Sequence, residues 1–174
     1  MSSHLILGGA RSGKSRHAEQ LARAHGGPVS VIVTAEALDE EMAERIRRHR
    51  ADRPTAWRTI ETPLALADAV QREAADGRVV IVDCLTLWLA NLLGDCAPER
   101  EPMLARERDA LLALLPALPG TVLLVANETG LGLVPDTPLG RRFRDEAGWL
   151  NQAVAERCDK VTFVAAGLPL ALKS

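Results

Sequence analysis

The sequence predicts one α/β domain with a mainly parallel central β-sheet flanked by helices. Runs of β-branched, apolar residues alternate with helical patterns along the chain, as in proteins whose strands and helices alternate. The runs at 78–83 and 121–127 are apolar nearly throughout, which is typical of strands covered on both faces. With 174 residues, the chain is expected to form a single domain, 1–174, with a substantial core.

The same patterns place the individual elements. Strands are expected at 4–9, 29–34, 78–83, 121–127 and 160–167, with a weaker candidate at 56–61. Helices are expected at 14–25, 39–50, 63–75, 85–93, 100–115 and 139–157. The tail "LPLALKS" is expected to turn at Leu168-Pro169 and to pair antiparallel with the strand before it. Because ligands of parallel sheets bind beyond the carboxyl ends of the strands, the loops after residues 8, 34, 83 and 127 are where function is expected.

The composition indicates a soluble globular protein, with 47% hydrophobic residues, 25% charged residues and a net charge of −2. Nothing in this balance favours a nucleic-acid or membrane partner, and no apolar run approaches the roughly 20 residues that span a bilayer. The N-terminal stretch lacks the features of a signal peptide. The cysteines, Cys84, Cys96 and Cys158, are odd in number and scattered, which favours a reducing compartment over a disulfide frame or a metal site, so we expect a cytoplasmic protein.

A phosphate-binding pattern directly follows the first expected strand. The stretch "GGARSGKS" matches G-x-x-x-x-G-K-[ST] between a strand and a helix, as the motif requires. Glycines let backbone N–H groups turn inward onto an anion, and the following helix adds the positive end of its dipole. Lys14 is expected to reach the β and γ phosphates and Ser15 to bind Mg²⁺, whereas the alternative is an ordinary glycine turn. The residues of this loop are Gly8, Gly9, Ala10, Arg11, Ser12, Gly13, Lys14 and Ser15.

Asp83 ends the run "RVVIVD" at the carboxyl end of an expected strand. A carboxylate at this position can face the Mg²⁺ ion of a bound nucleotide, which is the role we expect for it. Asp is also a favoured N-cap residue, so the same side chain could instead cap the helix that starts at Leu85. The two roles are compatible.

One histidine stands at the end of a basic helix that Pro54 terminates. Leu38, Met42 and Ile46 form an apolar stripe that His49 continues, whereas the neighbouring arginines point elsewhere. In one interpretation, His49 is a cation favoured by the carboxyl end of the helix dipole. In the other, nearby arginines keep the imidazole neutral and it attacks phosphorus. The residues alone favour the first interpretation.

A loop of about ten residues follows the strand expected at 121–127, and its length makes it a candidate functional segment. Asn127 and Glu128 emerge at the carboxyl end of that strand. The arginines of "RRFRDE" open the next helix, where they oppose its dipole, so they indicate an anion or an acidic partner. Ion pairs on the surface explain them equally well. The arginines are Arg141, Arg142 and Arg144, and their alternative partners are Asp136, Asp145 and Glu146.

Five segments, taken together and in this order, are typical of one protein family: "GGARSGKSRHAE", "LDEEMAERIRRHRADRPTAWRTIE", "VDCLTLWLANLL", "NETGLGLVP" and "RRFRDEAGWLNQ". With them the chain resembles, essentially end to end, the bifunctional adenosylcobinamide kinase / adenosylcobinamide-phosphate guanylyltransferase family of cobalamin biosynthesis. The segments "HRADRPTAWRTIE" and "NETGLGLVP" are far more specific than the phosphate loop. The resemblance implies a RecA-like P-loop NTPase fold and assembly as a homotrimer.

The resemblance also implies two reactions. Family members phosphorylate the aminopropanol hydroxyl of the corrinoid substrate adenosylcobinamide with ATP or GTP. They then transfer GMP from GTP onto the new phosphate, which gives adenosylcobinamide-GDP and pyrophosphate. The GMP passes through a covalent histidine intermediate, and the matching residue is His49, which reverses the interpretation drawn from the residues alone. Some relatives carry two adjacent histidines in this helix, and here the first of those positions is Arg48.

The resemblance identifies neither the corrinoid-binding residues nor a base for the kinase step. Two rival functions stay open: a simple P-loop small-molecule kinase, in which His49 is structural, and a RecA-type regulatory or motor module. The short chain and its nearly neutral charge weigh against a nucleic-acid motor. The nucleotide contacts implied by the resemblance are the loop from Gly8 to Ser15, Thr34, Ala35, Glu36, Arg50, Ala51, Asp52, Arg53, Glu61 and Asp83.

Overall fold

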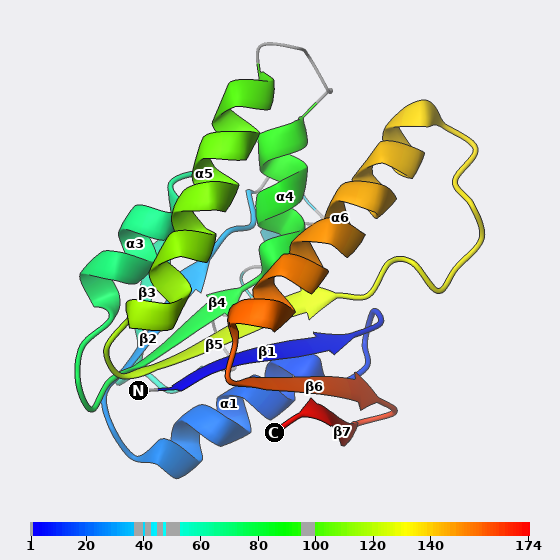
Figure 1. Cartoon of the computed structure of the whole chain (residues 1–174). Coiled ribbons are helices and arrows are strands. Elements are labelled where there is room, and N and C mark those ends of the chain that lie inside the picture. Colours follow the sequence, from blue (N-terminus) through cyan, green and yellow to red (C-terminus); the bar gives the residue numbers. More distant parts are fainter. Residues whose placement is uncertain (1, 37–39, 41–42, 45–46, 48–52, 95–99) are drawn as a thin grey trace.

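A seven-stranded β-sheet forms the centre of the computed structural model, which describes residues 2–36, 40, 43–44, 47, 53–94 and 100–174. The strand order is β3-β2-β4-β5-β1-β6-β7, and all described pairs are parallel except β6 with β7 (Figure 1). The predicted α/β class, the parallel sheet and the antiparallel C-terminal edge strand are therefore confirmed.

The expected strands are all present, including the weak candidate at 56–61. Of the helix expected at 39–50, residues 40, 43–44 and 47 are described and are helical, and the other residues lie outside the described part. The strands are β1 (Ser2–Gly8), β2 (Val29–Val33), β3 (Arg58–Glu61), β4 (Val79–Asp83), β5 (Thr121–Asn127), β6 (Lys160–Ala165) and β7 (Leu168–Lys173). The helices are α1 (Lys14–His25), α3 (Leu66–Glu73), α4 (Leu85–Leu93), α5 (Glu101–Leu114) and α6 (Pro138–Arg157), with a 3₁₀ turn η2 (Leu115–Ala117).

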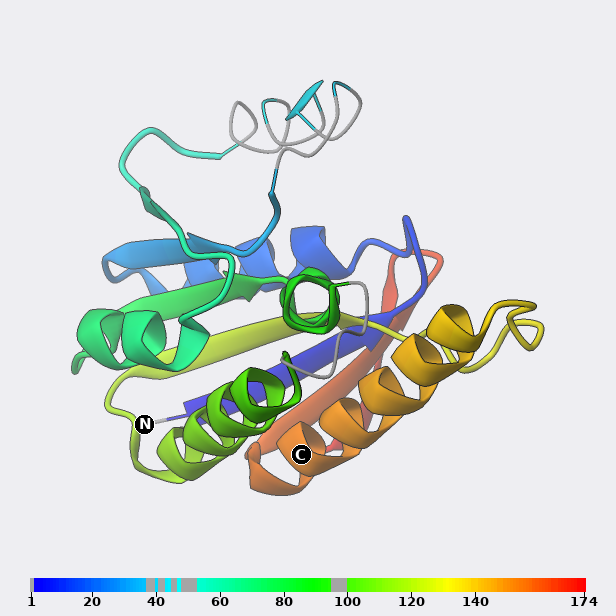
Figure 2. The ribbon, with the colours of Figure 1, turned by 90° about the horizontal axis from the view of Figure 1, so that it is seen from above.

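The sheet separates two apolar cores. Helices α3, α4, α5 and α6 cover one face, and α1 lies on the other (Figures 1 and 2). Because successive side chains of a strand point to opposite faces, β1 contributes Leu5 and Leu7 to the core under the four helices and Ile6 to the core under α1. Trp88 of α4 is fully buried in the larger core, and its indole N–H donates to the carbonyl oxygen of Leu64 at 2.8 Å. No described helix has the length and apolar character needed to cross a membrane.

The C-terminal turn lies two residues earlier than the sequence predicted. Leu168 and Pro169 already belong to β7, and the chain reverses at Ala166 and Gly167. Both residues have positive φ values, 52° and 79°. A two-residue turn of this kind matches the right-handed twist of paired strands, so the glycine determined the turn and the proline did not.

A pair of histidines, His4 buried and His17 half-buried, lies between β1 and α1. His4 is 9% exposed and shares a hydrogen bond of 2.8 Å between its Nε2 and Thr162 Oγ1. The His17 ring stands edge-on to it, with 6.5 Å between the ring centroids. Burial, then the positive charges of His17 and Lys160, lower the pKa of His4 from 6.5 to about 4. His4 is therefore neutral in the folded protein at neutral pH.

We expect this histidine to make the folded state acid-sensitive. Because its pKa is lower in the folded state, the unfolded chain binds more protons between pH 6.5 and about 4. The stabilisation is complete above pH 6.5 and falls by up to about 3 kcal/mol as the pH drops through this window. Urea unfolding at pH 7 and pH 4.5 should therefore show a smaller loss of stability for His4→Gln, whose amide can still donate to Thr162. An equal loss in both proteins would contradict the role of His4.

Candidate functional site

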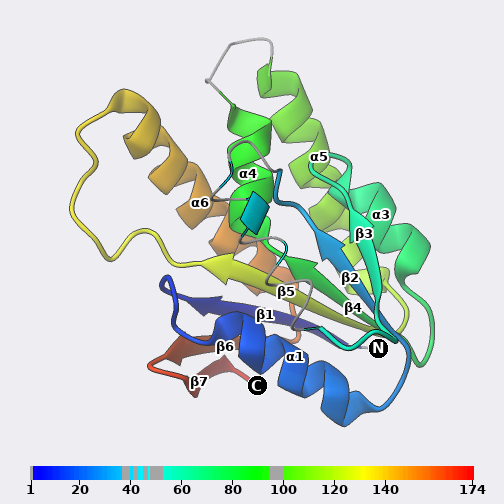
Figure 3. The same cartoon turned by 180° about the vertical axis from the view of Figure 1, so that it is seen from behind.

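The phosphate loop joins the carboxyl end of β1 to the amino end of α1 (Figure 3). Gly8 is the last residue of β1, and Lys14 is the first residue of α1. Gly13 precedes the helix with a φ of 97°, a left-handed conformation that favours glycine. The first turn of an α-helix leaves backbone N–H groups without partners inside the helix, which suits an anion. The strand–loop–helix arrangement predicted from the motif is therefore present.

The C-terminal hairpin, formed by β6 and β7, packs against this loop. A Cβ at Gly8 would lie 2.5 Å from both the carbonyl oxygen of Val164 and Ser12 Oγ. A Cβ at Gly13 would lie 3.2 Å from the Cα of Gly167. The backbone N–H of Gly167 also donates to the carbonyl oxygen of Ser12 at 2.8 Å. The loop and the turn between β6 and β7 thus pack backbone against backbone.

Lys14 and Ser15 occupy the first two positions of α1. The Lys14 ammonium donates to the carbonyl oxygen of Gly9 at 3.0 Å, so this side chain folds back over the loop. Ser15 is half-buried at the amino end of the helix. A lysine in this position is suited to neutralise the oxygens of a phosphate held by the loop.

Asp83 stands at the carboxyl end of β4 and pairs with an arginine. Its Oδ2 accepts a hydrogen bond of 2.8 Å from Arg53 Nη2, and the two side chains are only 19% and 6% exposed. The N-cap residue of α4 is Cys84, and no side chain caps this helix. The alternative role of Asp83 as a helix cap is therefore wrong. Two residues with separate expected roles therefore meet. Arg53 was expected to contact the nucleotide, and Asp83 was expected to face its Mg²⁺ ion.

Thr34 ties the end of β2 to the end of β4. Its backbone N–H donates to the carbonyl oxygen of Asp83 at 3.2 Å. Its hydroxyl donates to the carbonyl oxygen of Cys84 at 2.7 Å and accepts from the N–H of the same residue at 3.0 Å. Its carbonyl oxygen accepts from Asn91 Nδ2 at 2.7 Å. These bonds use its polar groups inside the protein, so Thr34 holds two strand ends together.

Two polar side chains of α4, Thr86 and Asn91, form further hydrogen bonds with backbone groups at this edge of the sheet. The sequence did not predict a role for either residue. Thr86 Oγ1 accepts a hydrogen bond of 2.7 Å from the N–H of Asn127, the last residue of β5. Asn91 Nδ2 donates to the carbonyl oxygen of Pro63 at 3.1 Å, in addition to its bond with Thr34. The available signal was the presence of Thr and Asn in the otherwise apolar stretch "LTLWLANLL".

The other expected nucleotide contacts lie around the same edge of the sheet. Val33, the last residue of β2, is opposite Glu61 on one side and Asp83 on the other. Glu61 and Glu36 are exposed, and Ala35 is half-buried. Four expected site residues lie outside the described part of the chain: His49, Arg50, Ala51 and Asp52.

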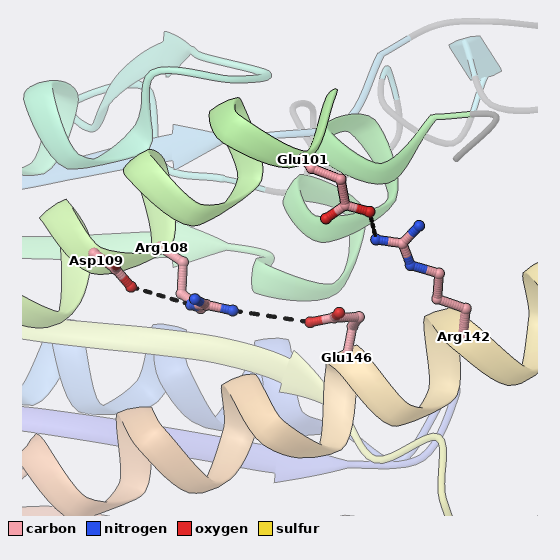
Figure 4. A network of polar contacts seen from close by, with 5 residues as sticks. All are labelled: Glu101, Arg108, Asp109, Arg142 and Glu146. Atoms are coloured by element: carbon pink, nitrogen blue, oxygen red, sulfur yellow. Dashed lines mark hydrogen bonds and ion pairs between the residues drawn. The ribbon is translucent and has the colours of Figure 1, made fainter. Parts of the chain in front are cut away.

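Polar contacts join α5 to α6. Arg142 of α6 pairs with Glu101 of α5, and Arg108 of α5 reaches Asp109 at 3.2 Å and Glu146 of α6 at 4.0 Å (Figure 4). Arg142 therefore has a carboxylate partner that the sequence spacing did not indicate, because Glu101 comes from a different helix. Glu146, an expected partner of the three arginines, is taken by Arg108.

The two remaining arginines, Arg141 and Arg144, form contacts with residues close to them in the sequence. Arg141 donates to the carbonyl oxygens of Pro135 and Asp136 at 3.1 Å and 2.9 Å. Arg144 pairs with Asp145 at 3.6 Å. The ion-pair interpretation is thus confirmed for Arg144, whereas Arg141 stabilises the end of the preceding loop through backbone oxygens.

The described cysteines are buried free thiols. Burial raises the pKa of both, that of Cys158 to about 11, so both thiols are protonated at neutral pH. Cys96 lies outside the described residues. Within the described part of the chain, no group of three or more His, Cys, Asp and Glu side chains is arranged to hold a metal ion by itself.

A Gly-rich loop between a parallel strand and a helix, with a lysine over it and a carboxylate at a nearby strand end, defines a P-loop nucleotide-binding domain. The particular family follows from comparison with known proteins. Residues 4–172 match the model of the family described as cobinamide kinase / cobinamide phosphate guanyltransferase. The chain belongs to this family, and it is an enzyme of cobalamin biosynthesis with cobinamide kinase and cobinamide-phosphate guanylyltransferase activities.

Curated relatives match over nearly their whole length. The chain is 61% identical to the bifunctional adenosylcobalamin biosynthesis protein CobP of Pseudomonas aeruginosa, covering 97% of this chain and 96% of that protein. It is 38% identical to CobU of Escherichia coli and 40% identical to CobU of Salmonella typhimurium, in each case over 97% of this chain and 98% of the relative. Among solved structures, flagellar accessory protein FlaH from Methanocaldococcus jannaschii is 16% identical with a TM-score of 0.48, covering 99% of this chain and 78% of FlaH.

The two neighbouring glycines of the loop offer a matched test of its packing. We expect Gly8→Ala to lower the free energy of unfolding by about 1–3 kcal/mol, because the added methyl group collides with backbone and forces the loop to move. Gly9→Ala is the control: its Cβ would meet no atom within 4 Å, so the stability should change by less than about 0.5 kcal/mol. Urea unfolding of the ligand-free variants measures both effects. Equal losses would show that Gly8 is not sterically constrained.

The buried ion pair between Arg53 and Asp83 predicts an asymmetric response to mutation. Asp83→Ala should lower the free energy of unfolding by about 3–5 kcal/mol, because it leaves a buried guanidinium without its carboxylate. Adding Arg53→Met should restore most of the loss, since the unpaired charge is then removed. The control is Glu40→Ala, which breaks an exposed pair with Arg47 and should leave the stability nearly unchanged. A double variant as unstable as Asp83→Ala alone would contradict the role of the pair.

Proposed function

We propose that this enzyme phosphorylates the aminopropanol hydroxyl of adenosylcobinamide with ATP or GTP and then transfers GMP from GTP through a covalent intermediate on His49. The products are adenosylcobinamide-GDP and pyrophosphate. The observation that carries this proposal is the phosphate loop at the carboxyl edge of the sheet, near Asp83 and Arg53, in a chain of this family.

One phosphate cradle can serve both reactions. Held by the loop, the β and γ phosphates present the γ phosphorus to an acceptor hydroxyl in the kinase step. In the guanylyl step the same two phosphates become the leaving pyrophosphate, so the cradle stabilises the leaving group. Attack by the imidazole on the α phosphorus splits one difficult displacement into two easier ones.

Ser15 and Asp83 fit a magnesium ion. A hydroxyl at the helix start and a carboxylate at a strand end supply the oxygen donors that Mg²⁺ prefers, with the remaining positions left to phosphate and water. When bound, the ion neutralises charge on the phosphate oxygens. In this structure the Asp83 carboxylate is paired with the Arg53 guanidinium. A metal ion bound to Asp83 would replace Arg53 as the positive partner of this carboxylate.

His49 is close in the sequence to Arg53, a described residue of this site. His49 precedes Arg53 by four residues, which limits the distance between their Cα atoms to about 14 Å. Arg53 is anchored by its side chain to Asp83 at the carboxyl edge of the sheet. This tether supports a role for His49 in contact with the inner phosphate of a nucleotide bound at the loop.

A homotrimer, implied by the resemblance, and a cytoplasmic location, favoured by the scattered cysteines, complete the proposal. Exposed leucines are compatible with an assembly, because large apolar side chains on the surface are often covered by a partner. Leu133 is 96% exposed and Leu131 81% exposed in the loop after β5, and Leu168 is 72% exposed on β7. Analytical ultracentrifugation of the full chain measures the oligomeric state directly.

Covalent labelling tests the proposed intermediate. Incubation with GTP labelled at the α phosphate should attach label to the wild-type protein, and a phosphoramidate should resist alkali and be lost in acid. His49→Ala should still bind GTP, because the phosphate loop is intact, yet acquire no label. The control is His25→Ala, which changes an exposed histidine at the end of α1 and should label as the wild type does. Label on the His49→Ala protein would remove His49 from this role, and a wild type that transfers GMP without becoming labelled would contradict the covalent intermediate.

A further inference from the structure

The carboxyl end of β5 lies between the two groups assigned to the nucleotide. In the sheet, β5 is flanked by β1, which leads into the phosphate loop, and by β4, which ends in Asp83 (Figures 1 and 3). Asn127, the last residue of β5, is opposite Gly8 in the pairing with β1. The next residue, Glu128, donates its backbone N–H to the carbonyl oxygen of Gly8 at 3.1 Å. Glu128 is therefore attached by its backbone to the first residue of the phosphate loop.

The strand end that carries Glu128 is held from two helices. The N–H of Asn127 donates to Thr86 Oγ1 of α4 at 2.7 Å. Its carbonyl oxygen accepts from Asn151 Nδ2 of α6 at 3.2 Å. Glu128 thus begins a long exposed loop but stands on a fixed base, as a group that positions a substrate requires.

Glu128 is a half-buried residue, and its carboxylate forms no salt bridge with a described residue. Its Oε1 accepts a hydrogen bond of 2.6 Å from the N–H of Gly130, which orients the carboxylate within the loop. Among the hydrogen bonds of the described residues, this is the one bond that its side chain makes. Lone pairs of the carboxylate therefore stay available for a proton.

Two buried hydroxyl groups, one in the phosphate loop and one on the residue after Glu128, have no hydrogen-bond partner in the described part of the chain. Among the described residues, Ser12 Oγ and Thr129 Oγ1 are the buried side-chain polar atoms without a hydrogen-bond partner. Ser12 belongs to the phosphate loop, and Thr129 directly follows Glu128. Buried polar groups are nearly always paired, so a molecule bound at the loop can supply the missing partner of such a hydroxyl.

We propose that Glu128 is the catalytic base of the kinase step and accepts the proton of the corrinoid hydroxyl. This role rests on the proposed function. The hydroxyl oxygen forms a bond to the γ phosphorus while the bond from that phosphorus to the bridging β–γ oxygen breaks. The nucleoside diphosphate leaves with the electron pair of the broken bond, and the hydroxyl proton moves to the Glu128 carboxylate. A positioned base of this kind contributes about 10²–10⁴-fold to the rate.

The guanylyl step makes no such demand. Its acceptor is the corrinoid phosphate, which is already an anion at neutral pH and has no proton to lose before it attacks. The imidazole that attacks first is a neutral nucleophile with its own lone pair. Glu128 is thus required in the kinase step and not in the guanylyl step. The guanylyl transfer of the same variant therefore serves as the control for its kinase activity.

The test compares both half-reactions in the full-length enzyme. Kinase activity is measured with adenosylcobinamide and ATP labelled at the γ phosphate, and guanylyl transfer with adenosylcobinamide phosphate and GTP labelled at the α phosphate. Glu128→Gln keeps an oxygen that can accept from Gly130 but cannot take a proton, and Glu128→Ala loses both properties. Glu156→Gln, a change on the exposed carboxyl-terminal part of α6, is the matched control.

We expect Glu128→Gln to lower the kcat of the kinase about 10²–10⁴-fold. GTP affinity, covalent labelling and guanylyl transfer should stay within about threefold of the wild type, and Glu156→Gln should change neither reaction. Normal kinase activity in Glu128→Gln with loss only in Glu128→Ala would show that the residue just holds the loop, and would overturn the proposal. Parallel losses in both half-reactions would overturn it as well. A wild-type enzyme unable to phosphorylate any corrinoid would overturn the proposed function together with this role.

Discussion

The absence of a side chain at Gly8 is the constraint on which the site depends. At this position the phosphate loop comes so close to the backbone of β6 that a Cβ would stand 2.5 Å from the carbonyl oxygen of Val164. The close approach lets Gly167 of the C-terminal turn bind Ser12 in the loop through backbone atoms. The edge hairpin, remote in sequence, therefore determines the shape of the loop, and through it the direction in which α1 and Lys14 face the phosphates.

The strand order places the phosphate loop and Asp83 on opposite sides of the β5 strand end. Strand β5 separates β1 from β4, so its carboxyl end stands between the phosphate loop and Asp83. Side chains of α4 and α6 form hydrogen bonds with Thr34, which follows β2, and with Asn127, the last residue of β5. The loop after β5 is long and exposed, yet its first residue, Glu128, is bound to β1 by a backbone hydrogen bond.

The pair formed by Arg53 and Asp83 links the nucleotide site to the segment that carries His49. Breaking a buried ion pair leaves an uncompensated charge, and the cation paired with this carboxylate is Arg53, four residues beyond the histidine in the sequence. In the function proposed above, a metal ion bound with the nucleotide would compete with Arg53 for this carboxylate.

The sequence by itself determined the elements and their chemistry. Apolar runs identified the strands, the Gly-Lys-Ser pattern identified the phosphate loop, and Asp83 stood at a strand end as expected, because these properties depend on residues adjacent in the chain. Only the tertiary structure decided which distant residues meet: Arg53 with Asp83, Arg142 with Glu101, and Glu128 with Gly8. Spacing along the chain contains no information on strand order, and it is strand order that brings β5 between β4 and β1 and places Glu128 beside the phosphate loop.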